Sequence, residues 1–245
     1  MLVLDSPAAA RPSTALGAVA LRTIRWSGAA LFVLSLSYFL FSYVVTFGRP
    51  TTAVAVLGPV TWNVVLFTGF ALHHSVFARE SVRRWAADRL PPDLERSCYV
   101  WIASLLFIVV CALWQPVPGV AWEVRGITAL ALYALQLAGA VLAVVSAGAI
   151  DVFELAGVRV RRAGTVDFRT SGPYGQVRHP IYSGWILMVF AAPQMTMTRL
   201  VFAVVSCVYM VIGMAYEERS LRATSAGAYE RYMQQVRWKL IPLVY

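Results

Sequence analysis

Long apolar runs alternate with short polar segments along most of the chain. The runs cover residues 27–47, 53–76, 97–115, 127–150, 181–193 and 200–216. A helix needs about 20 apolar residues to cross a bilayer, and most of these runs approach that length. The run at 181–193 is shorter and ends at Pro193, which favours one arm of a helical hairpin with the last run. The pattern predicts an all-α fold, a polytopic integral membrane helix bundle with five full spans plus one short span in a C-terminal hairpin.

The segments outside the apolar runs complete this picture. Residues 1–26 are expected to form a cytoplasmic N-terminal lead, and residues 27–245 a single membrane domain, since no boundary interrupts them. After the last run comes a break at residues 224–227, followed by a helical stretch that places Tyr229 and Tyr232 on one face. Such spacing predicts a C-terminal amphipathic helix, either on the membrane surface or packed under the bundle. We expect the two tyrosines to be interface anchors rather than substrate contacts.

Composition and charge agree with a membrane protein. Hydrophobic residues make up 59% of the chain and charged residues 13%, whereas soluble domains are nearer half apolar and a quarter charged. The net charge of +9 lies in loops beside the apolar runs, where membrane lipids with anionic headgroups are the expected partners and nucleic acid is not. Of the 21 Lys and Arg residues, 18 fall on one side of the predicted topology. This bias puts both termini in the cytoplasm, and we expect a bacterial inner membrane.

Four polar clusters meet on the cytoplasmic side of this topology. They are His73-His74-Ser75, Glu95-Arg96-Ser97, Arg178-His179-Pro180 and Glu217-Glu218, and they include all three histidines of the protein. Ionisable groups near membrane depth indicate a functional site. Pro180 suits the first turn of a helix, which places His179 at the N-cap. Three histidines without a cysteine motif offer too few ligands for a metal, so we expect no metal site.

Several of these segments resemble a known superfamily. Arg178-His179-Pro180-Ile181-Tyr182-Ser183-Gly184 resembles the signature of the isoprenylcysteine carboxyl methyltransferase and phospholipid methyltransferase superfamily. Residues 170–174, Glu217-Glu218-x-x-Leu221 and residues 227–232 resemble its other motifs, so the resemblance is firm over 165–245. Residues 73–79 and 95–100 are similar to the bacterial methanethiol S-methyltransferase branch. Those enzymes convert methanethiol to dimethyl sulfide with S-adenosylmethionine.

The resemblance implies an S-adenosylmethionine site at the cytoplasmic mouth of the bundle. The residues it implies as cofactor contacts are Tyr174, His179, Pro180, Ile181, Tyr182, Glu217 and Glu218, with residues 166–169 of the preceding loop. A carboxylate only accepts hydrogen bonds, so Glu217 suits the ammonium or the ribose hydroxyls of the cofactor. The helix start around Ile181 and Tyr182 suits its carboxylate. For Glu218 a structural alternative remains open, an i,i+4 ion pair with Arg222.

Catalysis on a thiol needs a thiolate, because a free thiol has a pKa of about 8.5 and the thiolate is the nucleophile. His73 or His74 is the candidate to take the proton, since an imidazole titrates near neutral pH. Hydrogen bonding to lipid headgroups is the alternative role for both. Arg96 or Arg178 is the candidate to stabilise the thiolate, although the positive sulfonium itself favours an anion.

One position separates the possible methyl acceptors. Carboxyl methyltransferases of the superfamily carry an arginine four residues before the first glutamate, and Gly213 stands there in this chain. A small thiol is therefore the favoured acceptor. Carboxyl O-methylation of a prenylated cysteine and N-methylation of a phospholipid amine are the enzymatic alternatives. The alternative that is not an enzyme is a non-catalytic membrane protein associated with denitrification. This alternative predicts no affinity for S-adenosylmethionine.

Overall fold

The computed structural model describes residues 15–52, 54–77, 94–150, 152–159, 170–225 and 227–245, together with Val82, Trp85, Arg89 and Phe168. The helices are α1 (Ala15–Phe41), α2 (Leu57–Phe77), α4 (Glu95–Leu113), α5 (Gly126–Ile150), α6 (Val152–Leu155), α7 (Pro180–Phe190), α8 (Met197–Thr224) and α9 (Ala228–Gln235). A π-helical segment, Ser42–Thr46, extends α1, and a 3₁₀ turn, Gly172–Gly175, precedes α7. Of the predicted N-terminal lead, residues 1–14 lie outside the described residues, and the remainder belongs to α1.

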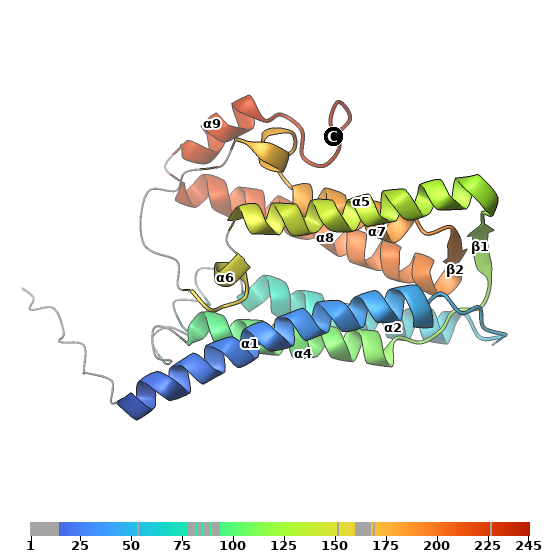
Figure 1. Cartoon of the computed structure of the whole chain (residues 1–245), viewed down its shortest axis with the longest axis horizontal. Coiled ribbons are helices and arrows are strands. Elements are labelled where there is room, and N and C mark those ends of the chain that lie inside the picture. The colour runs from blue at the N-terminus through green and yellow to red at the C-terminus, as the bar shows by residue number, and fades with distance from the viewer. Residues whose placement is uncertain are drawn as a thin grey trace, which may run out of the picture.

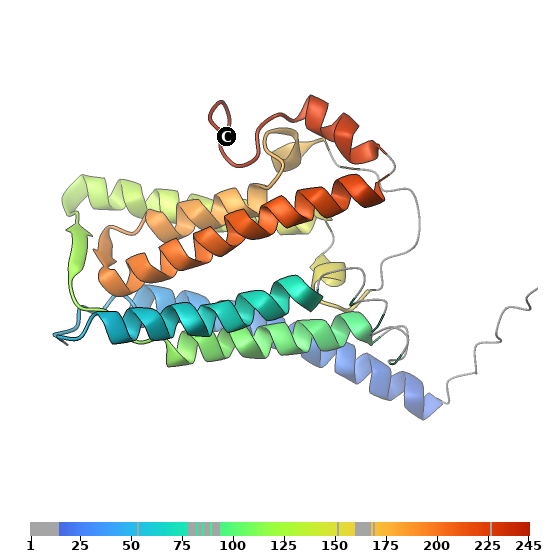
Figure 2. The same cartoon turned by 180° about the vertical axis from the view of Figure 1, so that it is seen from behind.

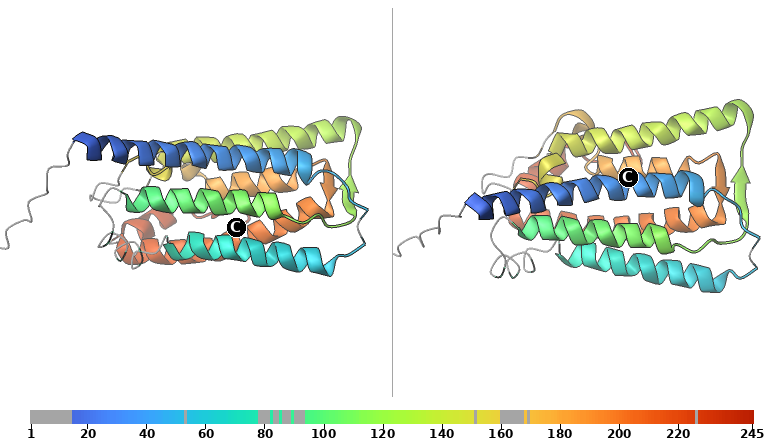
Figure 3. Two further views of the ribbon diagram at one scale, coloured as in Figure 1. Left: turned by 90° about the horizontal axis from the view of Figure 1, so that it is seen from below. Right: turned by 60° about the horizontal axis from the view of Figure 1, so that its bottom comes forward.

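The long helices form two layers that run along the length of the molecule (Figure 1). One layer contains α1, α2 and α4, which lie side by side when the molecule is seen from below (Figure 3). The other contains α5, α7 and α8, as the view from behind also shows (Figure 2). The closest pairs are α5 with α7 and α1 with α4, and α2 joins the layers by packing on both α4 and α8.

Aromatic side chains fill the space between the two layers. Phe39 of α1 stacks on Trp185 of α7 at 4.7 Å and on Phe202 of α8 at 5.3 Å between ring centroids. Phe67 of α2 and Phe107 of α4 belong to the same buried cluster. Every helix of the two layers except α5 thus contributes a buried or partly buried ring to one core. This core holds the two layers together and fixes the relative rotation of the helices that carry the polar clusters.

Among the described residues, four helical segments are long and apolar enough to cross a membrane: Val19–Thr46, α4, α5 and α8. The prediction of an all-α membrane protein is confirmed at this level. Helix α7 has 11 residues and reaches about 16 Å, which is shorter than a full span needs. Helix α2 has 21 residues but carries more polar side chains, so the number of full spans stays a prediction.

A small sheet at the end of the bundle opposite α9 lies outside the sequence prediction (Figure 1). Strand β1 (Val120–Glu123) leads into α5, and strand β2 (Gln194–Thr196) leads into α8. They pair antiparallel, with Val120 opposite Thr196. Strands of four and three residues give almost no periodic signal, and their pairing depends on two connections that are distant in sequence.

Gly184 of the signature segment has a packing role. A Cβ at Gly184 would lie 2.6 Å from the carbonyl oxygen of Gly139 and 2.7 Å from the backbone nitrogen of Ala143, both on α5. Only a residue without a side chain allows α5 and α7 to approach this closely. The glycine therefore sets how α7 lies against α5, and with it the direction in which the start of α7 presents its polar groups.

The C-terminal helix is packed under the bundle. Helix α8 ends at Thr224, Gly227 takes a left-handed conformation with φ of 83°, and α9 follows. Tyr229 and Tyr232 are buried together with Val236. The expectation that these tyrosines are membrane-interface anchors is therefore wrong. Their hydroxyl groups form hydrogen bonds with other groups of the protein, and their rings are buried.

Candidate functional site

Arg178, His179 and Glu218 form a buried polar cluster at the start of α7. The Glu218 Oε1 atom accepts a hydrogen bond from Arg178 Nε at 2.9 Å and lies 3.1 Å from His179 Nε2. The Tyr229 hydroxyl donates to the same oxygen at 3.2 Å. Each of these side chains is nearly excluded from solvent, and the carboxylate supplies the counter-charge that a buried arginine requires. The cluster joins α7, α8 and α9.

Arg178 also holds the segment that follows α9. Its Nη1 atom donates to the carbonyl oxygens of Val236 and Arg237, at 3.0 and 2.6 Å. The backbone N–H groups of Arg178 and His179 donate to the carbonyls of Trp238 and Lys239, both at 2.9 Å. The polar contacts of this guanidinium among the described residues are therefore all with the protein. This arrangement favours a positioning role for Arg178 over the predicted contact with a thiolate.

Glu217, the neighbour of Glu218, differs from it in exposure and in partners. Its side chain is 47% exposed, whereas that of Glu218 is 6% exposed. The Tyr182 hydroxyl donates to Glu217 Oε2 at 2.9 Å, and His179 Nδ1 lies 3.9 Å from the same atom. Among the residues that the structure describes, Oε1 of Glu217 has no hydrogen-bond partner. This carboxylate is oriented by the protein and keeps one oxygen for a ligand.

His179 connects the two glutamates. Its backbone caps α7, because the N–H groups of Tyr182 and Ser183 donate to its carbonyl at 3.0 and 3.1 Å. Its imidazole takes no part in the cap and stacks on the Tyr182 ring, with centroids 5.4 Å apart and planes 5° apart. The backbone N–H groups of Ile181 and Tyr182 were predicted to bind the cofactor carboxylate. The N–H of Tyr182 already donates within the protein, which leaves the N–H of Ile181 for that role. Pro180 is buried as the first residue of α7.

The 3₁₀ turn brings Tyr174 to the same place. The Tyr232 hydroxyl donates to the Tyr174 carbonyl at 2.8 Å, which ties the turn to α9. Burial, reinforced by the Glu217 carboxylate, raises the pKa of Tyr174, so its hydroxyl stays protonated near neutral pH. It is therefore a hydrogen-bond donor beside Glu217. Of the predicted loop contacts at 166–169 only Phe168 is described, and it stacks on Tyr232 at 5.5 Å; the other three lie outside the described residues.

The histidines of α2 lie around Tyr99 of α4. His74 Nδ1 is 2.9 Å from the Tyr99 hydroxyl, and the His73 ring stacks on the Tyr99 ring with centroids 6.0 Å apart. Both ring nitrogens of His73 are buried without a hydrogen-bond partner among the described residues. The Arg96 guanidinium lies over the Tyr99 ring at 5.2 Å, and it reaches the carbonyl of Leu155 at 3.5 Å.

Tyr99 also links these histidines to the start of α7. Tyr182 lies within electrostatic range of Tyr99, Tyr174 and Glu217. The structure therefore brings the predicted catalytic residues of α2 and α4 to the same end of the bundle as the predicted cofactor residues of α7 and α8. In the sequence, Tyr99 belongs to the family-like segment at residues 95–100, and no role was predicted for it. The signal that was available is its spacing, one turn after Arg96 at the start of α4.

Gly213 borders open space. A Cβ at this position would meet no atom within 4 Å among the described residues, in contrast to the tight packing at Gly184. Gly213 stands one turn before Glu217 on α8, so both lie on the same face of the helix. A small residue on an apolar helix can either leave room or let another helix approach closely, and at Gly213 the structure supports room.

Comparison with known proteins places this chain in a family. Methanethiol S-methyltransferase 2 of Bradyrhizobium diazoefficiens is 36% identical over 181 residues, which cover 71% of this chain and 70% of that protein. The methanethiol S-methyltransferase of Mycobacterium tuberculosis is 35% identical over 185 residues, covering 72% of this chain and 76% of that protein. This chain belongs to the methanethiol S-methyltransferase family. The family resemblance predicted from the sequence is thereby confirmed.

A more distant relative extends the comparison. Nurim of Homo sapiens is 24% identical over 184 residues, covering 69% of this chain and 70% of that protein. This similarity is consistent with the wider superfamily that the sequence motifs indicated. No family model and no solved structure matches the chain.

Proposed function

We propose that this protein is an S-adenosylmethionine-dependent membrane methyltransferase that S-methylates a small thiol, converting methanethiol to dimethyl sulfide. The names of the relatives support the reaction class and the acceptor. The observation that carries the proposal is the pair of adjacent glutamates. Glu218 is buried in ion pairs, while Glu217 is half exposed, held by Tyr182 and left with an oxygen for a ligand.

The residues at this end fit S-adenosylmethionine. Oε1 of Glu217 can accept from an ammonium group or a ribose hydroxyl, and the protonated Tyr174 hydroxyl can donate to an acceptor of the nucleoside. Tyr182 and His179 hold Glu217, which lowers the entropy lost when a ligand binds. Glu218 acts behind His179, as a positioning residue for the imidazole. When bound, S-adenosylmethionine supplies a methyl group on a positively charged sulfonium and leaves as a neutral thioether.

The chain must supply a thiolate and a direction of approach. His74 is placed to take the S–H proton of the acceptor at Nε2 in the tautomer whose Nδ1–H donates to the Tyr99 oxygen, with the Tyr99 O–H directed at the His74 carbonyl. His73, stacked on the same tyrosine, is the second candidate. Arg96 lies over the Tyr99 ring, where its positive charge favours a thiolate. Methyl transfer itself needs in-line approach with reacting atoms about 3–3.5 Å apart, so the packing of α2, α4 and α7 supplies most of the catalysis.

The acceptor is best tested with a panel. Purified protein in detergent is given S-adenosylmethionine with methanethiol, a farnesylated cysteine or phosphatidylethanolamine, and methyl transfer is measured by mass spectrometry. We expect turnover with methanethiol alone. A His74→Asn variant should turn over more slowly while cofactor affinity stays unchanged. Turnover only with a lipid acceptor, or no affinity for S-adenosylmethionine at all, contradicts the proposal.

We propose that the site faces the cytoplasm, with five full spans, the short α7 between them and both termini inside. The asymmetric distribution of Lys and Arg supports this orientation. Fusing a periplasm-active phosphatase after Tyr245 tests it. An inactive fusion is expected, and an active one reverses the assigned orientation.

A further inference from the structure

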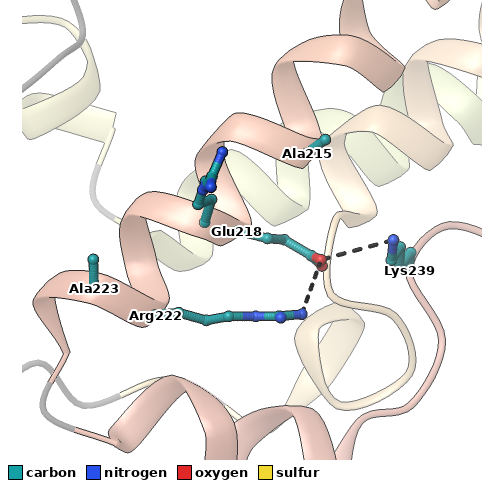
Figure 4. A pocket seen from close by; sticks show the side chains of 6 residues that line it. Ala215, Glu218, Arg222, Ala223 and Lys239 are labelled. Carbon is teal, nitrogen blue, oxygen red and sulfur yellow. Dashed lines mark ion pairs between the residues drawn. The ribbon is translucent and has the colours of Figure 1, made fainter.

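The polar end of α8 borders a hollow that the proposed reaction does not use. The hollow measures about 610 Å³ and is lined by Ala215, Glu218, Arg219, Arg222, Ala223 and Lys239. Arg222 and Lys239 reach toward Glu218 from two different segments, with the small Ala215 and Ala223 along the helix beside them (Figure 4). Glu217, which carries the proposed cofactor site, is absent from this lining.

Positive charge is in excess in this pocket. Three of its lining residues are cations and one is a carboxylate. That carboxylate is already held on its other oxygen by Arg178 at 2.9 Å. The Oε2 atom of Glu218 is 4.0 Å from Arg222 Nη2 and 3.8 Å from Lys239 Nζ, beyond hydrogen-bonding distance. Within the part of the chain that the structure describes, no second carboxylate lines the pocket.

An exposed apolar strip leads into the pocket along the same face of α8. Val204, Val208 and Ile212 are exposed and follow one another at helical spacing. Ala215, Arg219 and Arg222 continue that spacing beyond Ile212, so the strip and the basic wall of the pocket are one face of one helix. Because α8 is apolar enough to cross a membrane, the strip faces lipid tails and the pocket lies at headgroup depth.

We propose that this pocket binds the phosphate group of an anionic membrane lipid, whose acyl chains lie along the strip. Guanidinium groups match the oxygens of a phosphate in pairs, and two of the cations here are arginines. A free phosphate would use the cations but gain nothing from the apolar strip, so the strip favours a lipid. The proposal concerns a site separate from that of the methyl donor and stands independently of the acceptor.

The test compares two double variants that lose the same charge. Arg219→Gln/Arg222→Gln removes two lining cations, whereas Arg231→Gln/Arg237→Gln removes two exposed cations at the same end that do not line the pocket. Binding of phosphatidylglycerol and of phosphatidylcholine to purified protein in detergent is measured by native mass spectrometry. Each basic residue near a lipid surface contributes about fivefold in affinity, so the first variant should bind phosphatidylglycerol about 30-fold more weakly. Arg231 and Arg237 do not line the pocket, and in detergent no charged bilayer surface is present for them to attract, so the second variant should stay within about twofold. Phosphatidylcholine should bind weakly throughout.

Further measurements decide between the alternatives. Inorganic phosphate should not displace phosphatidylglycerol. Displacement at millimolar phosphate would mean that the pocket binds a free anion and not a lipid. Equal losses in both double variants would mean diffuse attraction and overturn the site. Loss of S-adenosylmethionine affinity in Arg219→Gln/Arg222→Gln, with lipid binding intact, would assign the pocket to the cofactor. Far-UV circular dichroism checks that both variants are folded, and an Arg219→Lys/Arg222→Lys variant should retain most of the lipid binding.

Discussion

Each end of the bundle buries an arginine, and the two ends satisfy it differently. At the α9 end, Arg178 has the carboxylate of Glu218 and two main-chain carbonyls. At the β1–β2 end, Arg199 donates to the carbonyls of Tyr43 at 2.9 Å, Val44 at 2.7 Å and Gln194, and no carboxylate among the described residues contacts it. One arginine is neutralised by a charge, the other by dipoles alone.

The π-helical segment explains how the Tyr43 carbonyl becomes available to Arg199. In an α-helix the N–H of Phe47 would donate to the carbonyl of Tyr43. Here it donates to Ser42 instead, at 2.7 Å, which frees the Tyr43 carbonyl for the guanidinium. Such rearrangement is tolerated at membrane depth only where other groups of the protein satisfy the backbone. The arginine is therefore the partner that makes the π-helical turn possible.

The difference between the ends indicates where function lies. The carbonyls that contact Arg199 are satisfied within the protein, and at the same end Asn63 bonds both the N–H and the carbonyl of Gln115 at 2.8 Å. Around Arg178, Glu217 remains half exposed with an oxygen that no described residue uses. A polar cluster whose groups bond one another stabilises the fold. A cluster with an oriented acceptor that no protein group uses can also hold a ligand.

The largest effect expected is on folding, from Glu218→Ala. It would leave Arg178 buried without a counter-charge, and breaking a buried ion pair in this way costs about 3–5 kcal/mol. The measurement is thermal unfolding in detergent. Glu217→Ala, one residue away, is the matched control; it loses only the hydrogen bond from Tyr182 and should change stability by about 0.5–1.5 kcal/mol. Similar losses in the two variants would remove the distinction between the glutamates.

The next effect is on ligand binding, from Glu217→Ala. Losing hydrogen bonds to a charged group costs about 1.5–3 kcal/mol, or about 10- to 100-fold in affinity for S-adenosylmethionine. Calorimetry in detergent measures it. Glu230→Ala removes an exposed carboxylate of α9 at the same end and should leave the affinity unchanged. An unchanged affinity in Glu217→Ala would remove the cofactor site from this position.

At the Arg199 end, Gly48→Ala tests the closed cluster. A Cβ there would lie 2.3 Å from Arg199 Nη2 and 2.9 Å from the Val44 carbonyl, so the guanidinium must shift. Overpacking of this kind costs about 1–3 kcal/mol, seen as a lower melting temperature with S-adenosylmethionine affinity intact. Gly58→Ala, where a Cβ meets no described atom within 4 Å, should melt like the native protein. A weaker cofactor affinity in Gly48→Ala would couple the two ends.

The smallest effect is expected from Tyr182→Phe. It removes one hydroxyl that orients Glu217 and leaves the ring stacked on His179, so the loss is about 0.5–1.5 kcal/mol of cofactor binding. Tyr133→Phe, which removes the hydroxyl of an exposed tyrosine on α5, is the control in the same calorimetric assay. A loss as large as that of Glu217→Ala would mean that the hydroxyl contacts the ligand itself.

Much of the fold was predictable because it depends on local properties of the chain. The apolar runs located α1, α2, α4, α5, α7 and α8. Helix α8 continues beyond its apolar run through Glu217 and Glu218, and the break at 224–227 separates it from α9 as expected. Hydrophobic run length, a proline at a helix start and a glycine at a break act within a few residues of themselves, so the sequence alone reveals them.

The roles of individual side chains were not predictable in the same way. Neighbouring residues on a helix point about 100° apart, so a one-dimensional motif cannot say which of Glu217 and Glu218 faces inward. The same holds for Arg178, which proved to bind the segment after α9, and for Tyr99, which lies between the two histidines and α7. The sequence by itself determined the apolar helices, the polar end and the family. Only the tertiary structure decided which carboxylate is structural and which is open, because that depends on helix rotation set by packing between distant segments.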